Sequence, residues 1–285
     1  MSEIIITCDS TADLPLEICQ KYNIKVIPLG VTLGATTYLD GVNITPDEIY
    51  AHHEKTGELP KTTAANVGDF IDFFTPFVEA GKTVIHFPIS SEMSSTYNNA
   101  LLASSELENV NIVDSKNLST GIGLVVVAAA EMAQNGANAE EIIAKAEELV
   151  KCSDASFVID NLEYLHKGGR CSAVAMLGAN LLKLKPCIDV TNGKMDVSKK
   201  YRGKYAEVLK QYVSERLADL ENIDNTRIFV THAGCADEIV NAVVEQVKAY
   251  DFFKEIIPCR AGCTISSHCG ADTLGILYIR KSPKA

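Results

Sequence analysis

The sequence has too few basic residues for a surface that binds nucleic acid or anionic membrane without specificity. Its 26 lysines and arginines stand against 37 aspartates and glutamates, which gives a formal net charge of −11 at pH 7. Both kinds of nonspecific binding need a basic surface. The charge balance therefore argues against nonspecific binding of nucleic acid or anionic membrane, although a local basic patch is compatible with it.

Long apolar runs and an export signal are also missing. The densest apolar stretch, "GIGLVVVAAAEMA", is interrupted by Glu131, and no stretch approaches the ~18–20 apolar residues of a membrane span. Glu3 stands where a signal peptide would carry lysines. The nine cysteines are odd in number and scattered. We therefore expect reduced thiols in a cytoplasmic protein without stable membrane insertion.

The glycine patterns of common nucleotide sites are absent as well. The sequence contains no G-x-x-x-x-G-K-[ST], and no G-x-G-x-x-G follows a predicted strand. Gly121 and Gly123 lie inside a predicted helix. These absences argue against nucleotide binding, and we expect no cofactor.

Strands and helices alternate over the first half of the chain. The predicted strands cover residues 3–8, 24–33, 83–89 and 110–115. Such alternation is typical of a parallel sheet with helices on both faces. Thr45 and Asn66 are predicted N-caps of two of the helices, and Pro76 is expected to end or kink the second one.

The pattern changes near residue 152. A strand at 155–160 is followed by a predicted hairpin over 185–200 with Asn192-Gly193 as its turn. Hairpin pairing mixed with helices predicts a separate α+β domain. The expected fold is therefore a two-domain protein, with an N-terminal α/β domain (1–152) containing a mostly parallel sheet and a C-terminal α+β domain (153–285) containing a mixed or antiparallel sheet.

Three predicted strand ends finish in polar loops, at Asp9-Ser10, Ser90-Ser91 and Asp114-Ser115. In a parallel sheet these ends lie on one edge, where ligands bind. The loop after residue 89, "SSEMSSTYNN", then opens a helix. A strand-to-helix junction of this kind usually binds an anion, yet this loop contains no lysine, arginine or glycine.

Hydroxyl and backbone N–H groups alone suit a small anion with a single charge. A carboxylate needs only a few donors, which such groups supply at the start of a helix. A phosphate with two charges would gain little there. The rest of the ligand would be recognised through apolar area, at about 25 cal/mol per Å² buried. A carboxylate with a long alkyl tail, a fatty acid, meets both conditions.

Two other kinds of site would use some of the same residues. Ser94, His268 and Asp114 or Asp9 supply the residue types of a serine esterase or thioesterase, but a triad is defined by geometry and no G-x-S-x-G elbow is present.

A metal site is the second alternative, and its possible ligands are Cys259, Cys263, His268 and Cys269. Structural zinc usually adds a second, distant pair of ligands. The sequence has none of similar spacing, so small buried cysteines are the favoured interpretation and we expect no metal.

Several motifs resemble those of one protein family. The most specific is "NLEYLHKGGRCS" (161–172), which matches L-x-x-L-x-x-G-G-R-[I/C]-S. Supporting segments, in order and nearly end to end, are "CDSTADLP", "KTTAAN", "ISSEMSSTYNNA", "KPCIDVTNGKMD" and "SSHCGADTLGILY". The chain resembles the DegV family, the fatty-acid-binding proteins that serve bacterial fatty acid kinase.

The resemblance implies a two-domain fold with the acyl chain of a ligand such as palmitate or oleate buried between the domains. It assigns carboxylate binding to Thr62, Ser94, His268, Thr63 and Ser95. It also implies that Arg170 and Arg202 dock the kinase, which phosphorylates the bound carboxylate to an acyl phosphate for phospholipid synthesis. The binding protein itself would perform no chemistry.

Three segments depart from the family motifs. Thr63-Ala64-Ala65-Asn66 replaces S-Q-P-S and lacks its proline. Ser95 replaces a glycine, at a backbone position expected to tolerate positive φ. Cys269-Gly270-Ala271-Asp272 replaces x-G-P-G and is expected to place an acid close to His268.

Overall fold

The structure is a computed structural model that describes residues 3–175 and 184–283. Its helices are η1 (Ser10–Ala12), α1 (Leu16–Lys21), α2 (Pro46–Thr56), α3 (Val67–Glu79), α4 (Thr96–Ser104), α5 (Thr120–Gln134), α6 (Ala139–Cys152), α7 (Glu163–Gly168), α8 (Ser172–Ala175), α9 (Tyr205–Arg216), η3 (Leu220–Asn222), α10 (Asp237–Lys248) and α11 (Cys263–Cys269). In this part of the chain, no helix is both long and apolar enough to cross a membrane.

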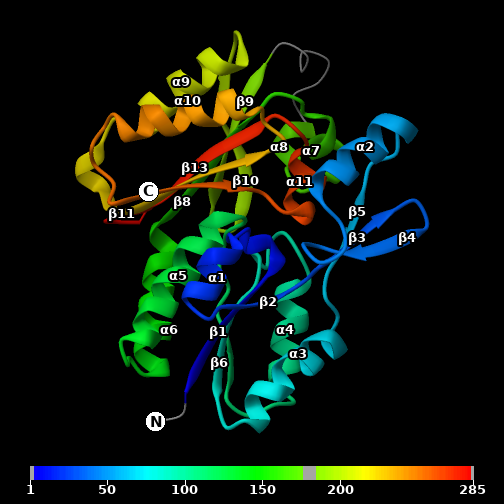
Figure 1. Ribbon diagram of the computed structural model, residues 1–285, viewed down its shortest axis with the longest axis vertical. Coiled ribbons are helices and arrows are strands. Elements are labelled where there is room, and N and C mark those ends of the chain that lie inside the picture. Colours follow the sequence, from blue (N-terminus) through cyan, green and yellow to red (C-terminus); the bar gives the residue numbers. More distant parts are fainter. Residues whose placement is uncertain (1–2, 176–183, 284–285) are drawn as a thin grey trace.

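The strands fall into three sheets (Figure 1). They are β1 (Ile4–Asp9), β2 (Lys25–Ile27), β3 (Gly30–Leu33), β4 (Thr36–Leu39), β5 (Lys61–Thr63), β6 (Thr83–Phe87), β7 (Val110–Ile112), β8 (Ser153–Ile159), β9 (Lys185–Thr191), β10 (Lys194–Tyr201), β11 (Ile223–Ala233), β12 (Glu255–Arg260) and β13 (Thr273–Arg280). Together they form a two-domain α/β and α+β fold of the predicted class.

The first sheet has the order β2-β1-β6-β7, and all its pairs are parallel, as predicted. Helices α5 and α6 cover one face, and α3 and α4 cover the other (Figure 1). Because both faces are covered, the two central strands are almost continuously apolar and buried.

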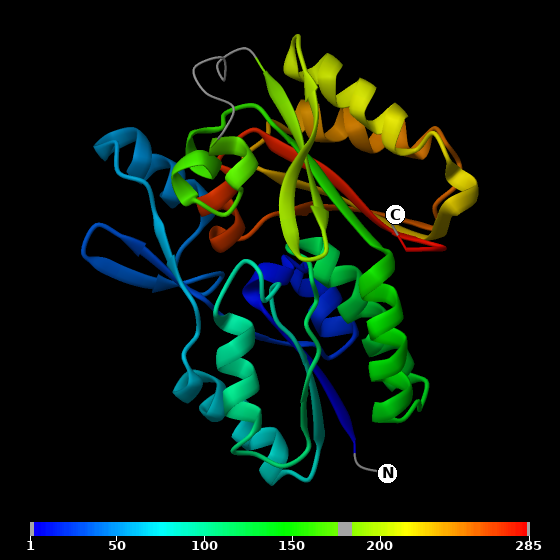
Figure 2. The same cartoon turned by 180° about the vertical axis from the view of Figure 1, so that it is seen from behind.

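The second sheet has the order β10-β9-β8-β13-β11-β12, and all its strands lie at or after Ser153. Its pairs are antiparallel except for β11 with β12, so the sheet is mixed. The predicted hairpin turn is present, with φ of 51° at Asn192 and 82° at Gly193. Figure 2 shows this hairpin reaching down to the loops of the first domain, where the Ser90 hydroxyl donates to the carbonyl of Gly193 at 2.8 Å.

The third sheet, β4-β3-β5, was not predicted. The extended run expected over 24–33 is broken after Ile27, so that β2 joins the parallel sheet while β3 turns away into this small one. Lys61–Thr63, which lies outside the predicted strands, forms the strand β5 and pairs with β3. Gly30 permits that pairing, since a Cβ there would lie 2.1 Å from the Thr63 hydroxyl.

The two predicted helix caps are present, whereas Pro76 does not end its helix. Thr45 and Asn66 each form a capping box with the acid three residues later. Helix α3 continues for three residues beyond Pro76. Phe70 and Phe74 are fully buried against the sheet, and this packing outweighs the one backbone hydrogen bond that proline removes.

Candidate functional site

Helix α11 lies at the centre of the candidate site, and two buried carboxylates hold its first turn. Asp40 accepts hydrogen bonds from the backbone N–H of Cys263 at 2.7 Å and of Thr264 at 2.9 Å. Asp13 accepts one from Gly262 at 2.8 Å. Since the first N–H groups of a helix have no partner within it, these carboxylates fix where the helix begins. We call Asp13, Asp40 and their bonds to residues 262–264 the α11 clamp.

The α11 clamp links segments that are far apart in the sequence. Asp40 also accepts a hydrogen bond from the Ser10 hydroxyl at 3.0 Å, and Asp13 accepts one from the Ser119 hydroxyl at 2.5 Å. Only 4% of Asp40 and 7% of Asp13 are exposed, and burial raises the pKa of Asp13 well above its usual value. The α11 clamp therefore joins the first domain to α11 through interactions shielded from solvent.

His268 occupies the last turn of this helix and faces β5. Its Nε2 lies 2.8 Å from the Thr62 hydroxyl, and its buried Nδ1 has no hydrogen-bond partner among the described residues. Burial lowers the pKa of His268 to about 4, with a smaller contribution from the nearby Arg170 charge. The ring is therefore neutral near pH 7.

Ser94 and Ser95 lie where α4 begins. The Ser94 hydroxyl accepts a hydrogen bond from the Thr96 backbone N–H at 3.2 Å and pairs with the Thr96 hydroxyl at 2.8 Å. Ser94 therefore holds the first residue of α4 through its hydroxyl. Ser95 has φ −70° and ψ −6°, so its replacement of a glycine places no strain on the backbone.

A cavity of about 260 Å³ brings together all five residues predicted to bind a carboxylate. We call it the inner cavity. Its lining includes Thr62, Thr63, Ser94, Ser95, His268 and Arg170, together with apolar side chains such as Leu29, Ile89, Met93, Leu118, Met195, Ile265 and Cys269. These residues come from both domains, so the cavity lies between them and combines hydroxyl groups with apolar walls.

The apolar wall continues from the inner cavity into the protein interior. A second, small cavity of about 20 Å³ shares Leu118, Ile265 and Cys269 with it. This space is bounded by Phe157 and Leu277 of the six-stranded sheet. The geometry thus gives a polar end at α4 and β5 and an apolar wall that faces the second sheet.

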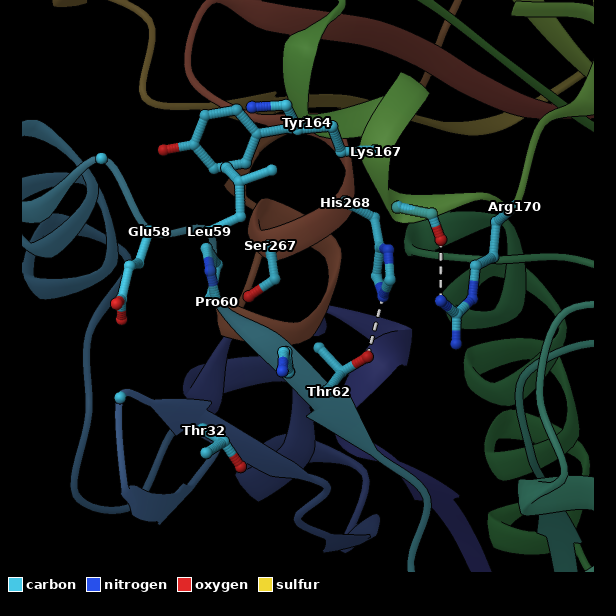
Figure 3. A pocket seen from close by; sticks show the side chains of 14 residues that line it. Thr32, Glu58, Leu59, Pro60, Thr62, Tyr164, Lys167, Arg170, Ser267 and His268 are labelled. Atoms are coloured by element: carbon cyan, nitrogen blue, oxygen red, sulfur yellow. Dashed lines mark hydrogen bonds between the residues drawn. The ribbon is translucent and has the colours of Figure 1, made fainter. Parts of the chain in front are cut away.

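An outer cavity of about 830 Å³ adjoins the inner one on the far side of the Thr62–His268 pair. It shares Thr62, Arg170 and His268 with the inner cavity. Figure 3 shows Thr62 and His268 pointing toward each other, with Arg170 beyond the ring. The Arg170 guanidinium donates a hydrogen bond to the Gly168 carbonyl at 2.7 Å.

The two arginines predicted to dock a partner occupy different positions. Arg170 is exposed, yet it lines both the inner and the outer cavity. Arg202 is exposed in the turn after β10 and lines neither of them. Arg170 therefore lies next to the expected ligand head group, a position that the sequence did not indicate.

The polar strand ends meet on one edge of the parallel sheet, as predicted. Asp9 accepts a hydrogen bond from the Ile89 backbone N–H at 2.8 Å, and Asp114 accepts one from Ser91 at 3.2 Å. Burial raises the pKa of Asp9 to about 6. Both acids therefore hold loops in place.

A catalytic triad is not assembled. Ser94 is bonded to Thr96, and His268 is bonded to Thr62, while Asp9 and Asp114 bind backbone N–H groups of the loops. Asp272 accepts a hydrogen bond at its backbone carbonyl from the Asp160 N–H at 3.0 Å, and burial raises the pKa of its carboxyl, with a smaller contribution from the Asp160 charge. The geometry gives no support to a serine hydrolase.

The cysteines and His268 near the C-terminus do not form a metal site. No cluster of three or more potential ligands occurs in the ranges 3–175 and 184–283. Cys259 and Cys263 are buried, in β12 and at the start of α11. Both are small core residues, as the sequence favoured.

Asp40 is the functional candidate that sequence analysis missed. Its partners, Cys263 and Thr264, are 223 and 224 residues away, and no local pattern predicts such a pairing. Asp13 lies within the motif "CDSTADLP". The motif therefore draws attention to this residue but does not indicate that it binds residue 262.

Comparison with known proteins identifies the family of this chain. The family profile described as "Uncharacterised protein, DegV family" matches residues 3–281. A DegV domain-containing protein of Caldanaerobacter subterraneus subsp. tengcongensis is 29% identical over 99% of this chain and 100% of its own length.

Two solved structures are similar over nearly their full length. A DegV family protein from Thermus thermophilus, described by its fatty acid binding, is 30% identical with a TM-score of 0.91, over 98% of this chain and 99% of that one. A stearic acid-binding protein from Eubacterium ventriosum is 28% identical with a TM-score of 0.83, over 99% of each chain. With its family profile matched from residue 3 to residue 281, this chain belongs to the DegV family.

Proposed function

We propose that this protein binds a long-chain fatty acid such as palmitate or oleate and performs no chemistry on it. The observation that carries the proposal is the inner cavity, in which Thr62, Ser94 and His268 line one space together with apolar side chains from both domains. Thr63 and Ser95 line the same space. The structures of the fatty-acid-binding DegV family protein from Thermus thermophilus and of the stearic acid-binding protein from Eubacterium ventriosum support this assignment.

The division of the cavity into a polar and an apolar part matches the two ends of such a ligand. The hydroxyls and the neutral imidazole of His268 donate hydrogen bonds to a carboxylate. Each buried CH₂ group contributes about 0.8 kcal/mol, so the tail supplies most of the binding free energy. No metal or other cofactor takes part in this proposal.

The ligand of protein purified from cells tests this function directly. We expect denaturing mass spectrometry to release a stoichiometric long-chain fatty acid, because apolar tails partition strongly into a shielded cavity. Ligand-free protein that also fails to bind added palmitate and oleate would contradict the proposal.

We further propose that the bound carboxylate is presented to a fatty acid kinase, which converts it to an acyl phosphate for phospholipid synthesis. The motif resemblance supports this step. Arg202 is the clearer docking candidate, because it is exposed and away from both cavities. Exposed charges at an interface chiefly govern the rate of encounter between partners.

Arg202→Ala should therefore leave palmitate affinity unchanged and slow phosphorylation of the bound fatty acid about tenfold, as expected for loss of a docking charge. Binding is measured with a fluorescent fatty acid, and phosphorylation with the purified kinase. Lys210→Ala, at an exposed position on α9, is the matched control. Equal phosphorylation of Arg202→Ala and the control would remove Arg202 from the docking site.

A further inference from the structure

The inner cavity is lined by a threonine whose hydroxyl the proposed head-group contacts leave unused. Thr264 lies in the first turn of α11, and only 5% of the residue is exposed. Its backbone N–H donates to Asp40, but its hydroxyl has no hydrogen-bond partner among the described residues. Buried polar side chains nearly always have such a partner, and the lack of one is unfavourable. A ligand oxygen beside Thr264 would supply it.

The position of Thr264 relates this hydroxyl to the carboxylate end of the ligand. Thr264 and His268 are four residues apart on α11, so they share one face of the helix at a spacing of about 5–6 Å. His268 lines both the inner and the outer cavity, whereas Thr264 lines the inner cavity and not the outer one. A fatty acid whose carboxylate lies at His268 would therefore pass Thr264 within its first few carbon atoms.

The side chain of Thr264 is able to turn either its hydroxyl or its methyl group toward the ligand. Threonine in a helix divides between two χ1 rotamers, and rotation between them changes which of the two groups faces a given neighbour. Against a plain methylene chain the methyl group makes the better contact, because a hydroxyl among apolar groups forms no hydrogen bond. A hydroxyl on the ligand reverses this preference, since the two hydroxyls then satisfy each other.

We propose that Thr264 determines specificity and adapts the inner cavity to a 3-hydroxy fatty acid. This inference rests on the proposed function, because it takes the carboxylate to lie at Thr62, Ser94 and His268. A hydroxyl on the second carbon would lie beside the carboxylate and compete for the same donors, whereas one on the third carbon lies further along the chain. It pairs there with the Thr264 hydroxyl, which either donates or accepts. A site that binds a ligand hydroxyl in this way discriminates against the analogue without it.

The ratio of the affinities for 3-hydroxypalmitate and palmitate tests this proposal. We expect the wild type to bind the preferred enantiomer of 3-hydroxypalmitate at least as tightly as palmitate. Thr264→Val removes the hydroxyl with little change of shape and should lower this ratio about tenfold, which corresponds to about 1.4 kcal/mol. Thr264→Ser keeps a hydroxyl and should retain most of the wild-type ratio. Both affinities are measured by displacement of a fluorescent fatty acid.

Thr75→Val is the matched control, because it removes a threonine hydroxyl from α3, outside the lining of the inner cavity. It should leave the ratio as in the wild type. A purely structural role of Thr264 would change both affinities alike, so a ratio that Thr264→Val leaves unaltered would overturn the proposal. An equal loss for ω-hydroxypalmitate, whose hydroxyl lies at the other end of the tail, would also overturn it. Wild-type protein that binds neither palmitate nor 3-hydroxypalmitate would instead refute the proposed function itself.

Discussion

Replacing Asp40 with alanine should lower the free energy of unfolding by about 2–4 kcal/mol and weaken palmitate binding more than about tenfold. Asp40 is buried and accepts the N–H groups of Cys263 and Thr264. Alanine would leave both groups without an acceptor, and each buried, unsatisfied donor costs about 1–3 kcal/mol. The first turn of α11 would then shift, and His268 on its last turn would move with it.

Denaturant unfolding measures the stability part of this prediction, and fluorescent fatty acid titration measures the affinity. The affinity is determined at low temperature, where circular dichroism verifies that the variant is folded. Asp40→Asn keeps one oxygen acceptor and should fall between wild type and alanine in both measurements. This graded recovery is expected only if Asp40 positions α11 for binding.

Asp47→Ala is the control for the loss of an acid near α11. Asp47 forms an exposed ion pair with Arg260, and such pairs contribute at most about 1 kcal/mol. We expect little effect on stability and none on palmitate affinity. If Asp40→Ala behaves like this control, the α11 clamp does not position the site.

His268→Ala is expected to weaken palmitate binding roughly 10- to 100-fold, because a hydrogen bond to a charged group contributes about 1.5–3 kcal/mol. Hexadecanol lacks the carboxylate, so its affinity should change much less. His268→Gln restores an N–H donor and should recover part of the loss. His166→Ala, at an exposed position on α7, should bind both ligands as the wild type does.

The depressed pKa of His268 gives this prediction a pH test. With a pKa of about 4, the His268 imidazole is neutral in the ligand-free protein. The affinity for ionised palmitate should therefore stay nearly constant from about pH 8 to pH 6. A ring that had to be charged would instead bind more tightly as the pH falls through its ordinary pKa of about 6.5. Such an increase would contradict the neutral-donor interpretation.

The same pKa determines how His268 affects acid stability. Between about pH 6.5 and pH 4 the unfolded chain binds a proton at this residue that the folded protein does not. Stability supplied by the neutral ring is therefore present above this window and lost as the pH falls through it. As the pH falls through this window, the free energy of unfolding of the wild type relative to His268→Gln should decrease by up to about 1.4 kcal/mol per pH unit. Denaturant unfolding of both proteins at several pH values measures this difference.

The parallel sheet and its polar edge could be predicted because they depend on local signals. Alternating apolar strands and helices fixed the type of sheet, and Asp9 and Asp114 marked two strand ends whose loops do meet. The turn at Asn192-Gly193 was likewise encoded by two adjacent residues. In each case the information lies within a few residues of the feature.

The parts that were missed depend on pairings between distant segments. Strand β5 is three residues long, and its sequence, Lys61-Thr62-Thr63, resembles a loop until β3 pairs with it. Helix α11 is short, and its start is set by acids more than 200 residues away. The motif resemblance located His268, yet only the folded chain reveals which groups hold it.

The hydrogen bond between Thr62 and His268 spans 206 positions of the chain. At roughly 5–20 residues per second, ribosomes would deliver His268 about 10–40 s after Thr62. A nascent chain would therefore display hydroxyls for a long interval without the imidazole that faces them. Ligand capture at full affinity would consequently wait until α11 has been synthesised, and chains interrupted before His268 would lack the imidazole that faces Thr62.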